Sequence, residues 1–133
     1  MTLLDKEPVK RAQKALKSFD QSLSVIVLDD SARTAKDAAA SLKCEVGAIV
    51  KSLLFKTENS FILCLIAGDK RCSLNKLKKL INKKNISMAK PEDVKTHTGF
   101  TIGGVSPVGH INSVEILIDN FLKRFSFLYA AAS

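Results

Sequence analysis

Two apolar segments separated by three polar residues constrain the fold of this chain most. Residues 49–57, IVKSLLFKT, and residues 61–67, FILCLIA, flank Glu58, Asn59 and Ser60. Short aliphatic and β-branched runs joined by a polar turn are typical of a β-hairpin. The chain is therefore predicted to contain a pair of antiparallel strands.

The segments before this hairpin predict a helix, a strand and a second helix. PVKRAQKALKSF (8–19) begins with proline, which favours a helix start, and it spaces apolar residues on one face. SVIVL (24–28) is a β-branched run and predicts a strand. Thr34, with Asp37 three residues later, predicts the cap of a helix that ends at Leu42. The apolar face of the first helix consists of Val9, Ala12, Leu16 and Phe19.

The segments after the hairpin predict two helices and two strands. Ser73 is expected to cap a helix with apolar residues inward and lysines along another side. Pro91, followed by two carboxylates, predicts a short helix that Gly99 closes. VEILI (114–118) and SFLYAAA (126–132) predict strands. The inward residues are Leu74, Leu77 and Ile81, the lysine row is Lys76, Lys79 and Lys83, and a helical turn is expected over 119–125.

Length and composition fit one mixed α/β domain. With 133 residues, of which 46% are hydrophobic and 26% charged, the chain can bury about two-thirds of its unfolded surface in one core. The longest apolar runs are too short to span a bilayer, and the N-terminus lacks the order of a signal peptide. We therefore expect a cytoplasmic protein without a membrane partner.

The positive charge of the chain is unevenly distributed. The net charge is +8, and residues 70–95 hold nine basic side chains against two acidic ones. Basic surfaces of this density attract phosphates, and nucleic acid is the usual cytosolic polyanion. The alternative is a lysine-rich surface that contacts only water. The candidate contacts to nucleic acid are Lys70, Arg71, Lys76, Lys79 and Lys83.

The cysteines and histidines give little sign of metal or covalent chemistry. The three cysteines form no CxxC pair and have no tight spacing to histidine, so no metal site is expected. Cys64 is interpreted as a small buried apolar residue. His97 is interpreted as a structural or solvated side chain. For His110, which follows a glycine-rich segment, a structural and a functional role are both open.

Residues 100–110, FTIGGVSPVGH, contain three of the six glycines and one of the three prolines. This segment matches neither GxGxxG nor a phosphate-binding loop that ends in GK[ST]. One interpretation is a tight turn, with glycine at positive φ and proline fixing the exit. The other is a pocket in which exposed backbone N–H groups hold a small polar ligand or an oxyanion.

Three segments, in this order, resemble the YbaK/prolyl-tRNA synthetase-associated editing domain family. They are EVGAIVKSLLF (45–55), LIAGDKR (65–71) and GFTIGGVSPVGH (99–110), and the similarity runs from about Thr34 to the end of the chain. The resemblance implies a central mixed, partly barrel-like sheet with flanking helices. It also implies a freestanding aminoacyl-tRNA deacylase, a hydrolase that opens the ester of mischarged tRNA without a cofactor or metal.

The resemblance assigns roles to individual residues. Lys51 matches the family's key lysine, which engages the phosphate of the terminal adenosine or the ester region. A lysine within an apolar strand must reach solvent or meet an anion, although an ordinary surface lysine like Lys56 is the alternative. By resemblance, water attacks the ester carbonyl, assisted by the terminal ribose hydroxyl. The implied substrate contacts are Ser52, Gly103, Gly104, Val105, Ser106, Pro107, Gly109 and His110.

The resemblance also implies domain boundaries, a substrate and a partner. Residues 1–133 are expected to form one editing domain with a helical N-terminal extension over about 1–22. The C-terminus looks shortened, since family members continue past Ser133 with a strand and a helix. The expected substrate is the acceptor end of tRNA for proline charged with alanine or cysteine, and prolyl-tRNA synthetase is the expected partner.

Two other function classes stay open. One is a non-catalytic module that binds tRNA or a synthetase through the lysine row, and hydrolysis that depends on Lys51 would separate it from a deacylase. The other is an unrelated small-molecule enzyme that uses the glycine-rich segment.

The amino acid that a deacylase would remove is open too. His110 stands where relatives vary, and one methylene changes binding by only about 1 to 3 kcal/mol.

Overall fold

The predicted hairpin is the centre of the structure, a computed structural model that describes residues 2–28 and 32–133. Strand β1 (Ile49–Lys56) pairs with β2 (Phe61–Ala67) in an unbroken antiparallel register. Both strands alternate their side chains between two buried faces of the sheet, so the apolar runs are nearly continuous. The hairpin prediction is confirmed.

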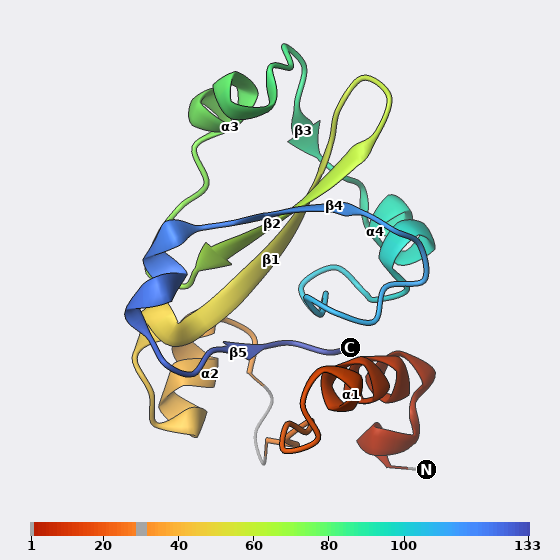
Figure 1. Ribbon diagram of the computed structural model, residues 1–133, viewed down its shortest axis with the longest axis vertical. Helices are drawn as coiled ribbons and strands as arrows, with labels where there is room; N and C mark the ends of the chain where they lie inside the picture. Colours follow the sequence, from red (N-terminus) through yellow and green to blue (C-terminus); the bar gives the residue numbers. More distant parts are fainter. Residues whose placement is uncertain (1, 29–31) are drawn as a thin grey trace.

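Three shorter strands extend the hairpin into a mixed sheet (Figure 1). Strand β4 (Glu115–Ile118) runs parallel to β2. At the other edge, β3 (Ser87–Met88) pairs antiparallel with the end of β1, and β5 (Tyr129–Ala130) pairs parallel with its start. The mixed α/β class is confirmed. The sheet is open and not closed into a barrel, because no strand in the described residues pairs with the outer edge of β4.

Helices α1 (Glu7–Phe19) and α2 (Ala35–Leu42) precede the hairpin, as predicted. Pro8 lies in the first turn of α1, where its missing N–H costs no hydrogen bond. The Thr34 Oγ1 accepts a hydrogen bond from Asp37 N at 3.1 Å and so caps α2.

Helices α3 (Leu74–Ile81) and α4 (Pro91–Thr98) lie between β2 and β4 in the chain, also as predicted. The Ser73 Oγ accepts a hydrogen bond from Lys76 N at 3.3 Å and caps α3. Gly99 ends α4 with a φ of 80°, a left-handed conformation that favours glycine.

The remaining helices are short 3-10 turns. They are η1 (Leu3–Asp5), η2 (Val46–Ala48), which leads into β1, and η3 (Asn120–Arg124), where a helical turn is predicted. Within 2–28 and 32–133, no helix has the length and apolar character needed to cross a membrane.

The sheet has a separate apolar core on each face. One core joins the sheet to α1, α4, η3 and the glycine-rich segment, while the other joins it to α3 and the segment before β3. Figure 1 accordingly shows α1 and α3 at opposite ends of the molecule. The buried members of the first core are Ala12, Val50, Leu54, Leu63, Leu65, Ala67, Ala89, Val94, Phe100, Val105 and Leu122. Those of the second core are Phe55, Ile62, Cys64, Leu77 and Ile86.

The strand predicted at 24–28 is absent from the structure. Its β-branched side chains are largely exposed, with Ile26 at 59% and Val27 at 47%. The segment has one hydrogen bond to the rest of the described chain, from Val25 N to the Gln13 side chain. A β-branched run forms a strand only where a neighbouring strand can pair with it, and none of the strands in the described residues pairs with this segment.

Three smaller predictions are also wrong. Phe19, predicted on the buried face of α1, is 87% exposed because it is the last residue of the helix. Leu74, predicted to face inward, is exposed at the first position of α3. The strand predicted over 126–132 is limited to Tyr129–Ala130. Beyond Ala130 the chain leaves β1, and Ser133 forms hydrogen bonds with the glycine-rich segment instead.

Candidate functional site

The glycine-rich segment begins with a tight turn. Gly104 N donates to Thr101 O at 2.9 Å, and Gly103, at the third position, has a φ of 83°. A positive φ at this position is what a type II turn requires of its glycine. A Cβ at Gly103 would meet no atom within 4 Å, so the turn conformation, not crowding, requires glycine there.

The end of the chain pairs with this turn. Ser133 N donates to Gly104 O at 2.9 Å, and Thr101 N donates to Ser133 O at 3.0 Å. A Cβ at Gly104 would lie 2.2 Å from the Ser133 Oγ and 3.2 Å from the Ser133 carbonyl carbon. Gly104 therefore permits the close approach of the C-terminal residue.

Helix α1 holds the other end of the segment. Arg11 donates from Nε to Gly109 O at 3.2 Å and from Nη2 to Gly99 O at 2.7 Å. Its guanidinium also lies 5.1 Å from the centre of the Phe100 ring. Gly109 has a φ of 80°, and a Cβ there would lie 2.9 Å from Arg11 O. The sequence gives no signal that singles out Arg11, because its partners are two backbone carbonyls about 90 residues away.

His110 and Ser106 fix the middle of the segment. The His110 Nε2 lies 2.6 Å from Ser106 O, and its ring meets Phe100 edge-on. The Ser106 Oγ, in a side chain that is 2% exposed, accepts a hydrogen bond from Val108 N at 3.1 Å. Pro107 is half-buried between them. These contacts give His110 a structural role within the segment.

Several backbone donors of the segment point to no protein acceptor. The amides of Gly103, Val105 and Ser106 donate no hydrogen bond to any group in the described part of the chain. Gly103 is exposed, whereas Val105 and Ser106 are buried residues. Buried amides normally have partners. The segment is thus both a set of tight turns and a source of two N–H groups that have no acceptor among the described residues.

Lys51 lies on the other side of the sheet from this segment. On β1, Leu53 and Phe55 pack with the α3 core and Val50 and Leu54 with the first core, so alternation places Lys51 on the α3 side. Its ammonium donates to Lys70 O. The structure therefore brings Lys51 together with the start of the basic segment, and it places Ser52 on the side of Phe100 and Val105.

An ion pair holds the backbone at Lys70. Arg124 of η3 makes two hydrogen bonds to the Asp69 carboxylate, at 2.8 and 3.0 Å. These hydrogen bonds lower the pKa of Asp69. The Lys70 ammonium lies 4.2 Å from the centre of the Phe121 ring, also in η3. Sequence reasoning missed Asp69 and Arg124, which lie 55 residues apart and carry no local signal.

The remaining basic candidates surround α3. Lys76 and Lys79 are exposed on the helix, and Arg71 is exposed before it. Lys83 does not continue their row, because Asn82 ends α3 with a φ of 55° and Lys83 is half-buried beyond it. Four of the five predicted contacts thus lie along 70–79, on the same side of the sheet as Lys51.

Cys64 and His97 pack against other side chains of the fold. Cys64 is 2% exposed, and burial, with Cys72 nearby, raises the pKa of its thiol to about 12. His97 stacks on Phe61, with the ring centres 4.1 Å apart. Across residues 2–28 and 32–133, no three His, Cys, Asp or Glu side chains gather as metal ligands would.

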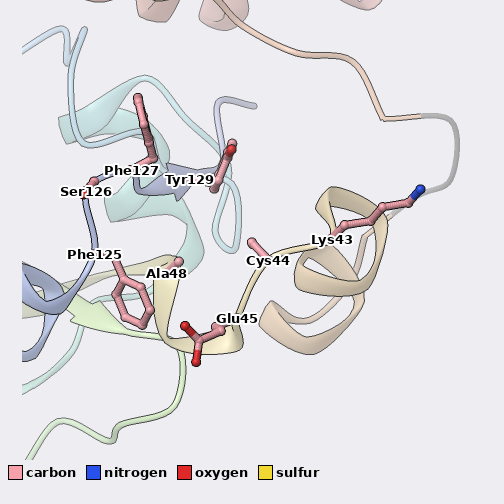
Figure 2. A pocket seen from close by; sticks show the side chains of 8 residues that line it. All are labelled: Lys43, Cys44, Glu45, Ala48, Phe125, Ser126, Phe127 and Tyr129. Atoms are coloured by element: carbon pink, nitrogen blue, oxygen red, sulfur yellow. The ribbon is translucent and has the colours of Figure 1, made fainter.

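A shallow hollow of about 450 Å³ lies elsewhere, beside η2 and β5 (Figure 2). Phe125 and Tyr129 line it together with Glu45, whereas the Lys43 side chain points away from its centre. None of the residues assigned to the site from the sequence lines this hollow. The residues assigned to the candidate site thus lie outside this hollow.

Comparison with known proteins decides the family. The sequence profile of the aminoacyl-tRNA editing domain matches residues 29–133, which include β1, the basic segment and the glycine-rich segment. The chain belongs to this family. The resemblance seen in the sequence is confirmed.

Relatives of this editing domain include bacterial synthetases. The domain is 33% identical over 123 residues to a proline--tRNA ligase of Kosmotoga olearia, covering 92% of this chain and 20% of that protein. It is 32% identical over 97 residues to the corresponding ligase of Fervidobacterium nodosum, covering 73% of this chain and 17% of that protein. The chain thus spans about a fifth or less of the length of these relatives.

A solved structure shares the fold. It is described as a candidate trans-editing enzyme for prolyl tRNA synthetase and superimposes with a TM-score of 0.89 at 39% identity. The match covers 96% of this chain and 81% of that chain. The overall architecture is therefore that of the editing domain.

The two positive-φ glycines of the segment should differ in their tolerance of a methyl group. Gly109→Ala has two costs: an alanine is strained at a positive φ, and its Cβ would collide with the backbone of α1. It should therefore destabilise the fold by about 2 to 4 kcal/mol. Gly103→Ala should lower the stability of the fold by about 1 kcal/mol, because the positive φ is strained for alanine but the added Cβ meets no other atom. Urea unfolding of both variants measures the difference, and equal losses would contradict the packing of α1 on Gly109.

Proposed function

We propose that this editing domain is an aminoacyl-tRNA deacylase that hydrolyses the ester of mischarged tRNA. The observation that carries the proposal is the pair of amides at Val105 and Ser106, which lie in buried residues and donate no hydrogen bond to the described part of the chain. Backbone donors of this kind stabilise the negative charge that develops on an ester carbonyl oxygen during attack. The family and the relatives in proline--tRNA ligases make an aminoacyl ester the expected substrate.

The reaction proposed needs no side-chain nucleophile. A water oxygen bonds to the ester carbonyl carbon, the bond to the ribose oxygen breaks, and that oxygen takes up a proton. The neighbouring ribose hydroxyl assists the proton transfer. The high pKa of Cys64 and the structural contacts of His97 leave these side chains without a role in the step. Gly103, Gly104, Pro107, Gly109 and His110 shape the loop that presents the donors.

Lys51 is proposed to bind a phosphate of the acceptor end. Its ammonium shares the α3 side of the sheet with Lys70, Arg71, Lys76 and Lys79, and a backbone carbonyl positions it without neutralising its charge. A phosphate can accept from an ammonium that keeps one such contact, because lysine has three donors. Lys83, half-buried beyond the helix, is proposed as a weaker contact.

The family and its relatives also suggest a substrate, a partner and a location. The proposed substrate is tRNA for proline that carries a small amino acid such as alanine or cysteine, the proposed partner is prolyl-tRNA synthetase, and the proposed location is the cytoplasm. Residues 1–133 are proposed to act as one domain, with 1–22 as an N-terminal extension. No cofactor enters the proposed step.

A non-catalytic tRNA-binding module is the second candidate. The exposed side chains of Arg71, Lys76 and Lys79 favour it, because they could bind a phosphate backbone without any reaction at the loop. Hydrolysis decides between the two functions.

Replacing Lys51 should slow hydrolysis while the fold persists. Lys51→Ala should reduce kcat/KM for alanyl-tRNA by roughly 30- to 1,000-fold, the effect of losing about 2 to 4 kcal/mol of transition-state stabilisation. Lys56→Ala, on the same strand but exposed, is the matched control and should keep the wild-type rate. A folded Lys51→Ala variant with wild-type kinetics would remove Lys51 from the site.

The basic surface should make tRNA binding depend on salt. Each lysine that contacts a phosphate contributes about 0.7 to 0.9 to the slope of log affinity against log salt. Lys76→Ala combined with Lys79→Ala should therefore flatten the slope by about 1.4 to 1.8. Lys10→Ala with Lys14→Ala, exposed on α1, is the control of equal charge. An unchanged slope for the α3 pair would exclude this helix from the tRNA site.

A further inference from the structure

One edge of β1 is covered at both ends and open in the middle. At its start, β5 pairs with Ile49 and Val50. At its end, β3 pairs with Phe55 and Lys56, and Ala89 N extends this ladder to Leu54 O at 3.0 Å. No strand in the described chain covers residues 51–53 on this edge. The sheet thus has a gap of three residues beside its central hairpin.

The backbone groups of Ser52 face this gap. In a strand, the N–H and C=O of one residue point to the same edge, and successive residues alternate between edges. Because Leu54 O accepts from Ala89 at this edge, the N–H and C=O of Ser52 point there as well. Neither group has a hydrogen-bond partner within residues 2–28 and 32–133.

The hydroxyl of Ser52 is unpartnered too. Its Oγ is buried and makes no hydrogen bond to the described residues, although the residue as a whole is partly exposed. Rotation about χ1 can carry a serine oxygen to the exposed side of its residue. Strand alternation places it on the face of Val50 and Leu54, which pack with Phe100 and Val105. Ser52 therefore has three polar groups without a partner among the described residues: its N–H and C=O face the open edge, and its Oγ lies on the face of the sheet that packs with the glycine-rich loop.

The gap and the loop are close in space. Ala130 pairs with Val50, and Ser133, three residues later, is bonded to Gly104. Three residues of extended chain span no more than about 10 Å. The C-terminal segment thus diverges from β1 just before Ser52 and joins the loop whose amides at Val105 and Ser106 have no partner among the described residues.

We propose that Ser52 is a positioning and specificity residue that binds the α-ammonium group of the aminoacyl ester. Its carbonyl oxygen and Oγ are acceptors, so they suit a ligand that brings hydrogen-bond donors. The α-ammonium lies one carbon from the ester carbonyl, which the loop amides are proposed to bind. Acceptors on β1 and donors on the loop would thus hold the two sides of the scissile group. This assignment rests on the proposed function.

The test compares two esters that differ in the group Ser52 is proposed to bind. Single-turnover hydrolysis is measured with alanyl-tRNA and with propionyl-tRNA, in which a hydrogen atom replaces the α-ammonium, and each rate is divided by its uncatalysed rate. Ser52→Ala should lower the acceleration for alanyl-tRNA about tenfold, as expected for a lost hydrogen bond to a charged group. The acceleration for propionyl-tRNA, which has no donor at this position, should change by less than about twofold, and Ser52→Thr should restore the alanyl rate.

The outcomes separate this assignment from the proposed function. An equal loss with both esters, or no loss with either, would overturn the role of Ser52 while leaving the deacylase intact. If the wild-type chain accelerates neither ester, the deacylase itself fails and the assignment falls with it. Thermal unfolding is the control for structure, since Ser52→Ala removes an unpartnered buried hydroxyl and should melt no lower than the wild type.

Discussion

The antiparallel ladder between β1 and β2 is the interaction on which the rest of the structure depends. Every other strand pairs with one of these two strands, and each apolar core includes residues from both. Leu63, at 0% exposure, lies within β2. Apolar cores pack on both faces of the hairpin, and shorter strands pair along parts of both edges. The register of the hairpin therefore determines where the loop, α3 and the C-terminal segment can pack.

This arrangement divides the candidate site between two sides of one strand. Lys51 and Ser52 are neighbours in sequence, and strand alternation directs one toward the basic segment and the other toward the glycine-rich loop. The η3 helix steadies the first side through Arg124 and Asp69, and α1 steadies the second through Arg11. A substrate with a phosphate at one end and an ester at the other suits such a division.

Sequence reasoning succeeded where the decisive contacts are local. Thr34, Ser73 and Gly99 act within a few residues of themselves, so the helix ends could be predicted, and the hairpin needs only a short turn. It failed at 24–28, because strand formation depends on a distant partner that propensity does not report. The loop could be located from its glycines. The hydrogen bonds that Arg11 and Ser133 make to the loop could not be predicted, because both residues reach it only through tertiary packing.

The central claim is that backbone groups of this fold open an aminoacyl ester. Its most direct test is single-turnover hydrolysis by the unaltered chain of tRNA for proline charged either with alanine or with proline. We expect rapid release of alanine and no release of proline above the uncatalysed rate. Binding of both tRNAs without acceleration of either hydrolysis would contradict the claim and leave a binding module.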